Sequence, residues 1–407
     1  MKKTVLREYA KLIAKTGVNV QKGQEVFIQA ELDQPEFVAM VVDECYKLKA
    51  KKVVVDWSYQ PLTKLHVRYR SLKTLSTLDN YEEARWQHYV DTIPCRIYLI
   101  SEDPDGLRGV NQEKMAKSQQ AKYPIIKGYR DQIENKYQWC IAAVPGEKWA
   151  KKLFPELRAS QAVEKLWEAI LKTSRVTGDP IQAWEEHNKD LHDRCEYLNS
   201  LHIRELRYKS SNGTDFTVGL AKNHVWEGGA SLTPDGRSFV PNMPTEEVFT
   251  APDRFSAEGT LAASLPLSHG GALIENFTIT FHEGRAVSFT AEKGGEALQS
   301  ILDTDEGAKY LGEVALIPAD SPISRMGLLF YNTLFDENAS CHFALGAAYP
   351  ENVEGGMEMS KEELKEAGLN DSLTHVDFMI GTADLEITGI RADGSEIPVF
   401  RRGVWAR

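Results

Sequence analysis

The chain has 407 residues, and its 48 basic and 59 acidic side chains give a formal charge of −11 at pH 7. An acidic excess of this kind argues against a nucleic-acid-binding protein, because binding to phosphate backbones relies on basic surfaces. Hydrophobic residues form 42% of the chain and charged residues 26%, so the composition is that of a folded globular protein and excludes a chain that stays disordered.

The N-terminal half alternates between helical and extended patterns. Apolar residues recur at helical spacing before Gly17, which stands where a first helix would end. A β-rich run at 25–30, a helical pattern at 35–50 and an apolar run at 53–57 then predict strand, helix and strand. The helical crossover implies parallel pairing, and the apolar second run predicts a sheet that is covered on both faces. Further strands of the same sheet are predicted at 96–100 and 139–145.

The C-terminal half has a different texture. Residues 160–199 are helical and heavily charged, and from Ile203 onward short alternating segments are separated by turns. The turn sequences at 211–214, 234–236 and 392–394 are typical of antiparallel connections. The segments predicted as strands are 215–220, 259–267, 275–281, 286–291, 313–317 and 376–390.

These patterns predict an α/β protein. At roughly 150 residues per domain, the length favours two domains, each large enough for a core that needs no disulfide bonds. We expect residues 1–198 to form an α/β domain with a mostly parallel sheet and a helical connector. Residues 199–407 are expected to form a strand-rich α+β domain.

The sequence contains no sign of export or of a membrane anchor. Its start lacks the apolar stretch of about 7 residues that a signal peptide needs, and no apolar run approaches the roughly 18 residues that span a bilayer. The five cysteines are scattered and form no CxxC pair, which is typical of reduced, buried thiols in a cytoplasmic protein. Cys341 is a weak candidate nucleophile, because a thiolate needs its base in space rather than next in sequence.

Common catalytic motifs are absent. No GxGxxG, GxxxxGK[ST], GxSxG or HExxH pattern supports a dinucleotide, nucleotide, serine-hydrolase or helical metalloprotease site.

The best local signal is the pair His375 and Asp377, which point to the same side of a predicted strand. Imidazole and carboxylate together suit a divalent transition metal. A hydrogen-bonded surface pair is the competing interpretation.

Other candidates are ambiguous from spacing alone. His342 precedes small, apolar residues and is either a core histidine or a ligand, and Tyr349 is either a packing residue or a hydroxyl donor to an oxyanion. Glu313 opens an apolar strand and would ordinarily have a counter-charge. Glu246 and Glu247 are adjacent in an extended stretch, so their side chains diverge, and spacing does not decide which faces inward.

Several segments resemble the aminopeptidase T and aminopeptidase S family of metallopeptidases. The resemblance extends over nearly the whole chain, including its start. The segments are EGGASLTPDG from Glu227, MPTEEVFTAPD from Met243, LGEVALIP from Leu311, FYNTLFDENASCHFALGAAYP from Phe330 and HVDFMIGT from His375. The resemblance implies five metal ligands, which are Glu247, Glu313, His342, His375 and Asp377. It also implies that Tyr349 is an active-site tyrosine.

This ligand set implies two divalent ions, which we expect to be zinc, cobalt or manganese. Three carboxylates supply a charge of −3 against +4, which leaves room for a bridging hydroxide. Two ions can lower the pKa of a bridging water, polarise the scissile carbonyl and hold the free α-amine of a peptide. Tyr349 would then stabilise the oxyanion, and Glu246 or a metal-bound carboxylate would carry the proton to the leaving amine.

We therefore expect a cytoplasmic, metal-dependent aminopeptidase whose substrates are peptides with a free N-terminus. The resemblance also implies a homodimer in which the N-terminal domain restricts access to the site. Neither a nucleic acid nor a membrane is an expected partner. One alternative is another dinuclear hydrolase, an amidase or a phosphoesterase, which would cleave substrates that lack a free amine. The other is a noncatalytic peptide-binding protein, which would contain no metal.

Overall fold

The computed structural model describes all 407 residues, which form two compact units. Unit 1 comprises Met1–Glu185 and Ala230–Pro244, and unit 2 comprises Glu186–Gly229 and Thr245–Arg407. The second half of the chain therefore contributes a short segment to unit 1, which the sequence patterns did not indicate. The division at residues 198 and 199 stays a prediction about separately folding domains.

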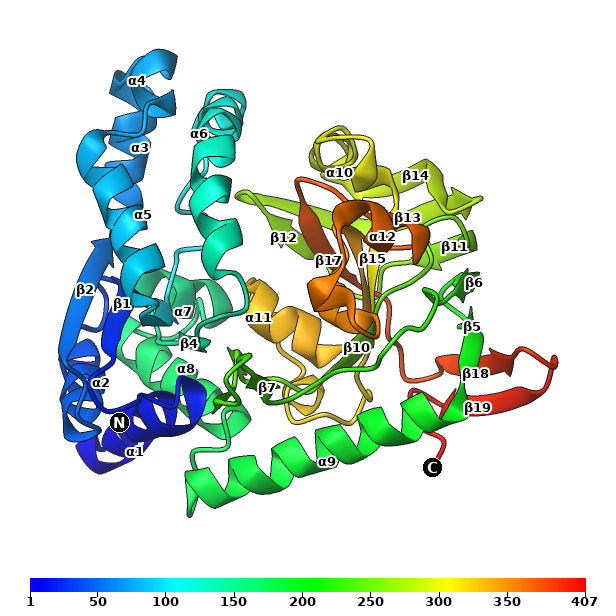
Figure 1. Cartoon of the computed structure of the whole chain (residues 1–407), viewed down its shortest axis with the longest axis horizontal. Coiled ribbons are helices and arrows are strands. Elements are labelled where there is room, and N and C mark those ends of the chain that lie inside the picture. Colours follow the sequence, from blue (N-terminus) through cyan, green and yellow to red (C-terminus); the bar gives the residue numbers. More distant parts are fainter. The chain divides into compact units, whose positions relative to one another are not determined.

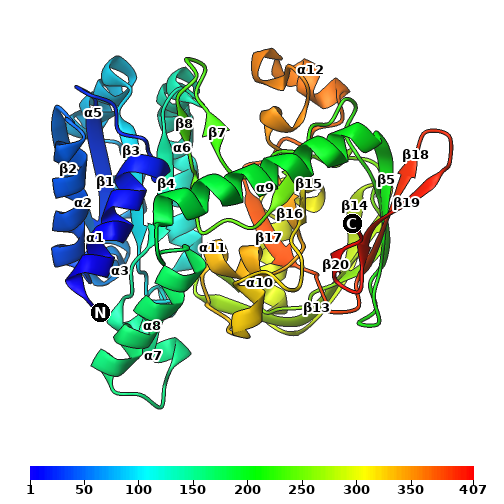
Figure 2. The ribbon, with the colours of Figure 1, turned by 90° about the horizontal axis from the view of Figure 1, so that it is seen from below.

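Unit 1 is built on a five-stranded parallel sheet with the strand order β2-β1-β3-β4-β9. Figure 1 labels β2, β1 and β4 of this sheet, and Figure 2 labels its first four strands. The strands are β1 (Glu25–Glu31), β2 (Lys52–Ser58), β3 (Cys95–Ile100), β4 (Trp139–Ala143) and β9 (Asn242–Met243). Every pair in the sheet is parallel, which confirms the predicted pairing. The prediction that the apolar run of β2 is covered on both faces is wrong. Its three valines are only half-buried, because β2 is an edge strand.

Helices surround this sheet. Those of unit 1 are α1 (Lys3–Leu12), α2 (Pro35–Lys47), α3 (Gln60–Tyr69), α4 (Leu72–Ser76), α5 (Asn80–Thr92), α6 (Gln112–Ile133), α7 (Glu147–Leu153) and α8 (Ala159–Thr173). Helix α1 continues as a π-helical turn that ends at Gly17, as predicted, and a Cβ atom at Gly17 would lie 2.9 Å from the Sγ of Cys140. The rings of Tyr9, Phe37 and Trp167 pack together in the core. A short antiparallel hairpin, β7 (Ser231–Leu232) and β8 (Ser238–Phe239), also belongs to unit 1.

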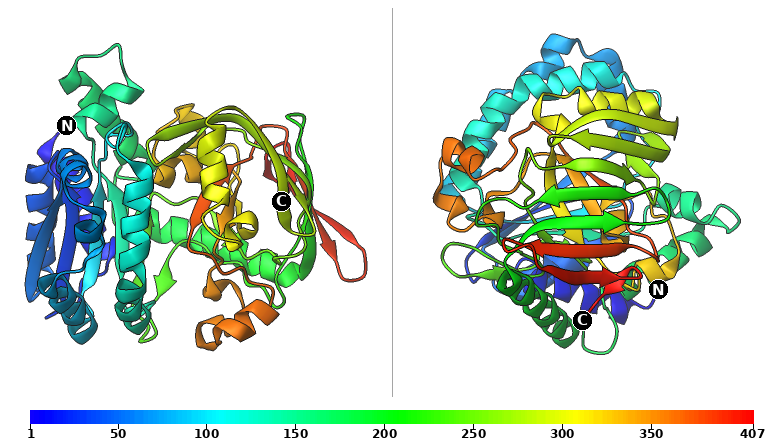
Figure 3. Two further views of the ribbon diagram at one scale, coloured as in Figure 1. Left: turned by 90° about the horizontal axis from the view of Figure 1, so that it is seen from above. Right: turned by 90° about the vertical axis from the view of Figure 1, so that its right-hand side faces the viewer.

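Unit 2 contains two antiparallel sheets, which confirms the predicted strand-rich second part of the α/β fold. The larger sheet has nine strands, and Figure 3 shows it face-on in the right-hand view. Its strands are β5 (Ile203–Lys209), β6 (Asp215–Gly219), β11 (Glu258–Ala262), β12 (Leu267–His269), β13 (Ala272–His282), β14 (Arg285–Lys293), β18 (Glu386–Arg391), β19 (Glu396–Arg401) and β20 (Val404–Trp405). The smaller sheet, in the order β10-β15-β16-β17, consists of β10 (Val248–Thr250), β15 (Leu311–Leu316), β16 (His342–Gly346) and β17 (His375–Met379).

One apolar core lies between the two sheets of unit 2. Residues of the larger sheet, such as Phe216 and Phe281, share it with Phe343 and Phe378 of the smaller sheet. The helices of this unit are α10 (Gly295–Leu302), α11 (Thr333–Asp336) and α12 (Lys361–Glu366), and α9 (Pro180–Leu201) runs into it from unit 1. The predicted turns at 211–214 and 392–394 do join antiparallel strands. None of the helices combines the length and the apolar character needed to cross a bilayer.

Candidate metal centre

The smaller sheet of unit 2 gathers polar side chains on the face turned away from the apolar core. Strand side chains alternate between faces, so Phe343 of β16 packs in the core while His342 and Ala344 lie on the opposite face. On β17, Val376 and Phe378 likewise belong to the core. The predicted alternation around the histidine–aspartate pair is therefore confirmed.

Strand register brings the charged residues into line. Glu313 of β15 and Asp377 of β17 are both register partners of Ala344 on the central strand β16. The small side chain of Ala344 leaves the two carboxylates room to converge. A β-bulge at Gly312 shifts the register of β15 and so re-aims Glu313. At Gly312 a Cβ atom would lie 2.2 Å from the carbonyl oxygen of Ala347, so only glycine fits there.

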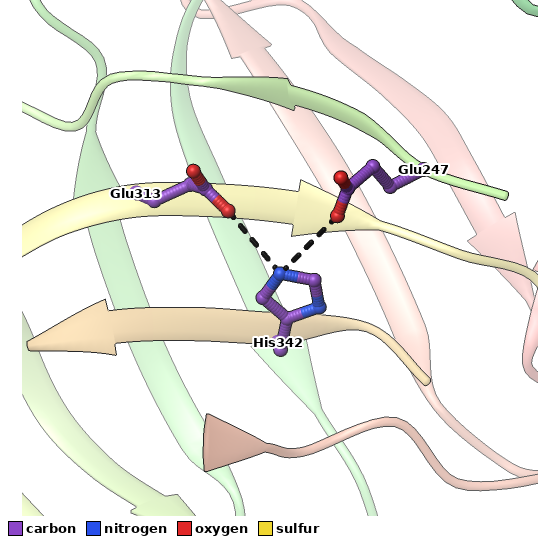
Figure 4. A group of neighbouring side chains, drawn as sticks. All are labelled: Glu247, Glu313 and His342. Carbon is purple, nitrogen blue, oxygen red and sulfur yellow. Dashed lines mark hydrogen bonds and ion pairs between the residues drawn. The ribbon is translucent and has the colours of Figure 1, made fainter. Parts of the chain in front are cut away.

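The five predicted ligands come together at this point. The Nε2 atom of His342 lies 3.2 Å from Oε1 of Glu313 and 3.4 Å from Oε2 of Glu247, as Figure 4 shows. The Nε2 atom of His375 lies 3.2 Å from Oδ1 of Asp377 and 3.8 Å from Oε2 of Glu313. Glu313 therefore stands between the two imidazoles, with one oxygen toward each.

Backbone carbonyl groups fix the orientation of both imidazoles. His375 donates a hydrogen bond from Nδ1 to the carbonyl of Ala347 at 2.7 Å. His342 donates from Nδ1 to the carbonyls of Glu337 and Ser340 at 3.1 and 3.2 Å. A carbonyl oxygen only accepts, so Nδ1 carries the proton in each ring and Nε2 faces the carboxylates. Metal-binding histidines are commonly held in this way.

Burial and mutual repulsion shift the pKa values of the cluster. Burial, together with the charges of Glu313 and Asp377, raises the pKa of Glu247 to about 8, although His342 opposes the shift. Burial acts to lower the pKa of His342, but its hydrogen bond to Glu313 and the nearby carboxylates raise it to about 9. Burial likewise acts to lower the pKa of His375, but the carboxylates of Asp377 and Glu313 raise it to about 10. Protons thus offset the crowding of negative charge, a role that divalent cations fill in metal sites.

The donor set fits divalent metal ions. Two overlapping triads, Glu247 with Glu313 and His342, and Glu313 with His375 and Asp377, each place their ligand atoms within 4.8 Å of one another. Oδ1 of Asp377 is buried, and its partner is the Nε2 atom of His375 at 3.2 Å, with which it forms an ion pair but no hydrogen bond of good geometry. A buried carboxylate oxygen needs a cation beside it, which is either the protonated imidazole or a metal ion. Imidazole and carboxylate ligands suit zinc and similar transition metals.

The two adjacent glutamates diverge, as expected for neighbouring residues in an extended stretch. Glu247 points to His342 (Figure 4). Glu246 is also buried, but its carboxylate lies 3.9 Å from Nε2 of His187 on α9, and its backbone N–H donates to Oδ1 of Asn338. The spacing could not choose between the two glutamates, whereas the fold places only Glu247 beside the histidines of the cluster.

Glu337 is a member of the cluster that the sequence reasoning missed. It is partly buried in a short helical turn after α11, and burial of its carboxyl group together with the charges of Asp377, Glu247 and Glu313 raises its pKa well above the usual range. A side-chain hydrogen bond links it to Asp377. The only available signal was its position within the segment that carries the family resemblance.

Tyr349 and Cys341 lie near the cluster in very different settings. The ring of Tyr349 packs against that of His375, with centroids 4.8 Å apart, and the residue is 38% exposed. Burial of its hydroxyl near Glu313 and Asp377 raises its pKa well above 10. The thiol of Cys341 is buried and donates to the carbonyl of Ile317 at 3.2 Å, and burial raises its pKa to about 12. Cys341 is therefore not a nucleophile.

The five cysteines and His187 lie outside the set of predicted site residues. All five cysteines are free and buried, as predicted. His187 stands in the heavily charged helical segment, which favours a surface position, yet the structure does not place its side chain on the surface. Its side chain is 9% exposed and hydrogen-bonds to the carbonyl of Thr245 at 2.8 Å.

Known proteins match this chain over nearly its whole length. The profile of the Peptidase_M29 family, described as thermophilic metalloprotease (M29), matches residues 2–405. The chain is 44% identical over 403 residues to aminopeptidase AmpS of Bacillus subtilis (strain 168), with 98% of each chain covered. It is 42% identical over 403 residues to aminopeptidase 2 of Geobacillus stearothermophilus, with 98% of this chain and 97% of the relative covered. The structure of wild-type AmpT from Thermus thermophilus has a TM-score of 0.91 at 40% identity and covers 100% of both chains.

Proposed function

The chain belongs to the M29 family of metallopeptidases and is a metal-dependent aminopeptidase, and we propose that it works with two divalent ions. The resemblance to aminopeptidases T and S is thereby confirmed. The observation that carries the two-ion proposal is that Glu313 belongs to both ligand triads. Glu313 would then be a ligand of both ions, Glu247 and His342 would hold one of them, and His375 and Asp377 would hold the other.

When bound, the ions would supply Lewis-acid chemistry, namely a water of lowered pKa, a polarised scissile carbonyl and a ligand position for the uncharged α-amine of the substrate. The chain's own contribution is to hold the ligands in one orientation through the carbonyls of Glu337, Ser340 and Ala347. Only a peptide terminus offers a free α-amine, so the activity is that of an exopeptidase.

Two proton-handling roles fall to residues of the chain. Tyr349 would donate a hydrogen bond from its hydroxyl to the oxyanion, since it is partly exposed beside His375 and its high pKa keeps the proton on it. The proton for the leaving amine would come from Glu246 or from a carboxyl group at the metal ligands. Glu337 joins these candidates because its raised pKa makes it a proton donor next to Asp377.

Metal stoichiometry of four variants tests the bridging role. Wild-type protein should bind two ions per chain, Glu247→Gln and Asp377→Asn one each, and Glu313→Gln none at the same free metal concentration. Glu366→Gln, on the exposed face of α12, is the matched control and should keep two. Plasma mass spectrometry of the dialysed proteins gives the counts. A Glu313→Gln variant that retains two ions would refute the shared ligand.

A pair of peptides tests the amine requirement. A short peptide should release free amino acids, its N-acetylated twin should release none, and chelation should abolish the release. Equal cleavage of the two peptides would instead favour an amidase. Metal-reconstituted protein prepared with zinc, cobalt or manganese would identify the ion that gives the highest rate.

We also propose that two copies of the chain associate through unit 1. Helix α3 presents Leu62, Leu65 and Tyr69 with exposed fractions of 51%, 45% and 73%. Exposed apolar side chains gathered on one helix mark an interaction surface. Sedimentation should give a dimer, and Tyr69→Glu should shift it toward the monomer. A monomeric wild-type protein would refute the proposal.

The five free cysteines support a reducing compartment, and we propose that the protein works in the cytoplasm. Cell fractionation followed by an activity assay checks this location. Activity found only outside the cytoplasmic fraction would refute it.

A further inference from the structure

Unit 1 contains a cavity whose lining residues include none of the proposed metal ligands. Its volume is about 300 Å³, and it lies between the sheet and helix α5. The floor is a row of register partners, Asp56 of β2, Gln29 of β1 and Tyr98 of β3. Gln29 is exposed although β1 is an inner strand of the sheet, so this part of the sheet is open to a ligand.

The topology of the sheet favours a binding site at this place. From β1 the chain passes to β2 on one side and later returns to β3 on the other, so the strand order reverses between β1 and β3 (Figure 2). In open parallel sheets, ligands bind at such a switch point, toward the carboxyl ends of the strands. Gln29 is the fifth of the seven residues of β1, and it lies in that half of the sheet.

Arg96 indicates that the ligand of this cavity carries an anionic group. Its side chain lines the cavity, and its Nε and Nη2 atoms are buried and make no hydrogen bond. The guanidinium carbon lies 4.3 to 5.4 Å from the ring centroids of Tyr89, Tyr137 and Trp86. The π faces offset part of the charge, but they leave the planar N–H donors without a carboxylate or carbonyl partner. Unsatisfied buried donors of this kind are costly, and a bound anion would relieve the cost.

Groups of the opposite charge lie in the same cavity. Asp56 and Glu82 line it, and each already contacts a cation, Asp56 that of Arg85 and Glu82 that of Lys122 at 3.8 Å. Arg85 and Asp56 are each about two-fifths exposed, so a ligand ammonium group has access to the carboxylate. The cavity thus offers unpaired donors of Arg96, the carboxylates of Asp56 and Glu82, and the aromatic rings of Trp86 and Tyr89.

We propose that this cavity binds a free α-amino acid in its zwitterionic form. The ligand carboxylate pairs with Arg96, the ammonium group lies near Asp56 and Glu82, and the side chain packs against Trp86. A volume of about 300 Å³ is at the small end of the range of ligand pockets, which suits a single amino acid rather than a peptide. The reaction of this enzyme releases such molecules, so the site would sense product in unit 1, a unit that contains none of the proposed metal ligands.

Binding of L-phenylalanine to the metal-loaded enzyme, followed by saturation-transfer NMR, tests the proposal. L-Phenylalaninamide lacks the carboxylate and N-acetyl-L-phenylalanine lacks the ammonium group, so both should bind at least tenfold more weakly than L-phenylalanine. Arg96→Gln should weaken L-phenylalanine binding at least tenfold. Arg130→Gln is the matched control, because Arg130 is half-exposed on α6 and lies outside the cavity, and it should leave binding unchanged.

Two further variants keep the test decisive. Gln29→Phe fills the cavity without removing a charge, and it should abolish binding even if Arg96→Gln proves unstable by circular dichroism. His375→Ala disrupts the metal ligands in unit 2, and binding in unit 1 should survive it. L-Phenylalanine binding that is lost in His375→Ala, or that is unchanged in both Arg96→Gln and Gln29→Phe, would overturn the proposal. Neither result bears on whether the enzyme is an aminopeptidase, which the acetylated peptide decides.

Discussion

Replacing Ala344 with leucine should close the metal centre without removing any of its ligands. Ala344 is fully buried on β16, and its register partners on the neighbouring strands are Glu313 and Asp377. His342 lies two residues earlier on the same face, whereas Phe343 points into the apolar core. A leucine side chain would therefore project between the two carboxylates that the proposed ions bring together.

The expected size of the effect follows from packing. Forcing extra methylene groups into a filled site costs about 1 to 3 kcal/mol. A cost of that size in the metal-bound state weakens ion binding by roughly 5- to 150-fold, since about 1.4 kcal/mol corresponds to a factor of ten. Ligands flank Ala344 on both sides, so relaxation in one direction compresses the other. We therefore expect a value near the upper end, about 100-fold.

A chelator-competition titration measures the metal affinity, and peptide hydrolysis at fixed free metal measures the consequence for activity. Leu345→Met is the control, because Leu345 is buried on the opposite face in the apolar core and the change conserves volume. It should cost less than about 1.5 kcal/mol in stability and leave metal affinity within a few-fold. An Ala344→Leu variant with wild-type metal affinity and activity would show that this face of β16 does not border the ions.

Three other perturbations have defined outcomes. Tyr349→Phe should lower kcat by about 100-fold with unchanged metal content, because it removes one donor to the oxyanion; an unchanged kcat in steady-state hydrolysis would leave Tyr349 with a packing role. Chelation should lower the stability of the protein by about 3 to 4 kcal/mol relative to metal at 100 to 1,000 times its dissociation constant, as thermal unfolding with and without chelator measures. Burial, aided by Arg204 and His202, lowers the pKa of His224 from 6.5 to about 4. The unfolded chain then binds the extra proton between these values, so stability should fall by roughly 3 kcal/mol as pH drops from 6.5 to 4, and the fall should be smaller in His224→Asn.

The parallel sheet of unit 1 was predictable because its signals are local. The runs at 25–30 and 53–57, joined by one helix, identify β1, β2 and their parallel pairing. The edge position of β2 was not predictable, since it depends on where the later strands β3 and β4 add to the sheet. The addition of β9 to this sheet could not be foreseen either, because its two residues come from a segment 99 residues after β4.

The candidate metal centre was predictable only in part from local pattern. Alternation along β17 correctly placed His375 and Asp377 on one face. The convergence of Glu313 and His342 with this pair depends on strand register between segments far apart in sequence, and on the bulge at Gly312. The family resemblance, not spacing, named those residues together. Glu337 went unnoticed because a glutamate in a short helical turn carries no periodic signal.

The two faces of the smaller sheet link metal binding to the stability of unit 2. Core side chains such as Phe343 and Phe378 alternate along the strands with the proposed ligands, so the same backbone register serves both. A register slip of one residue would exchange the two faces, placing carboxylates in the core and aromatic rings at the ions. Phe343 also packs against Tyr208 and Phe216 of the larger sheet, with ring centroids 5.1 and 5.3 Å apart. The apolar core therefore selects the register in which the five proposed ligands meet, and bound metal would in turn stabilise that register.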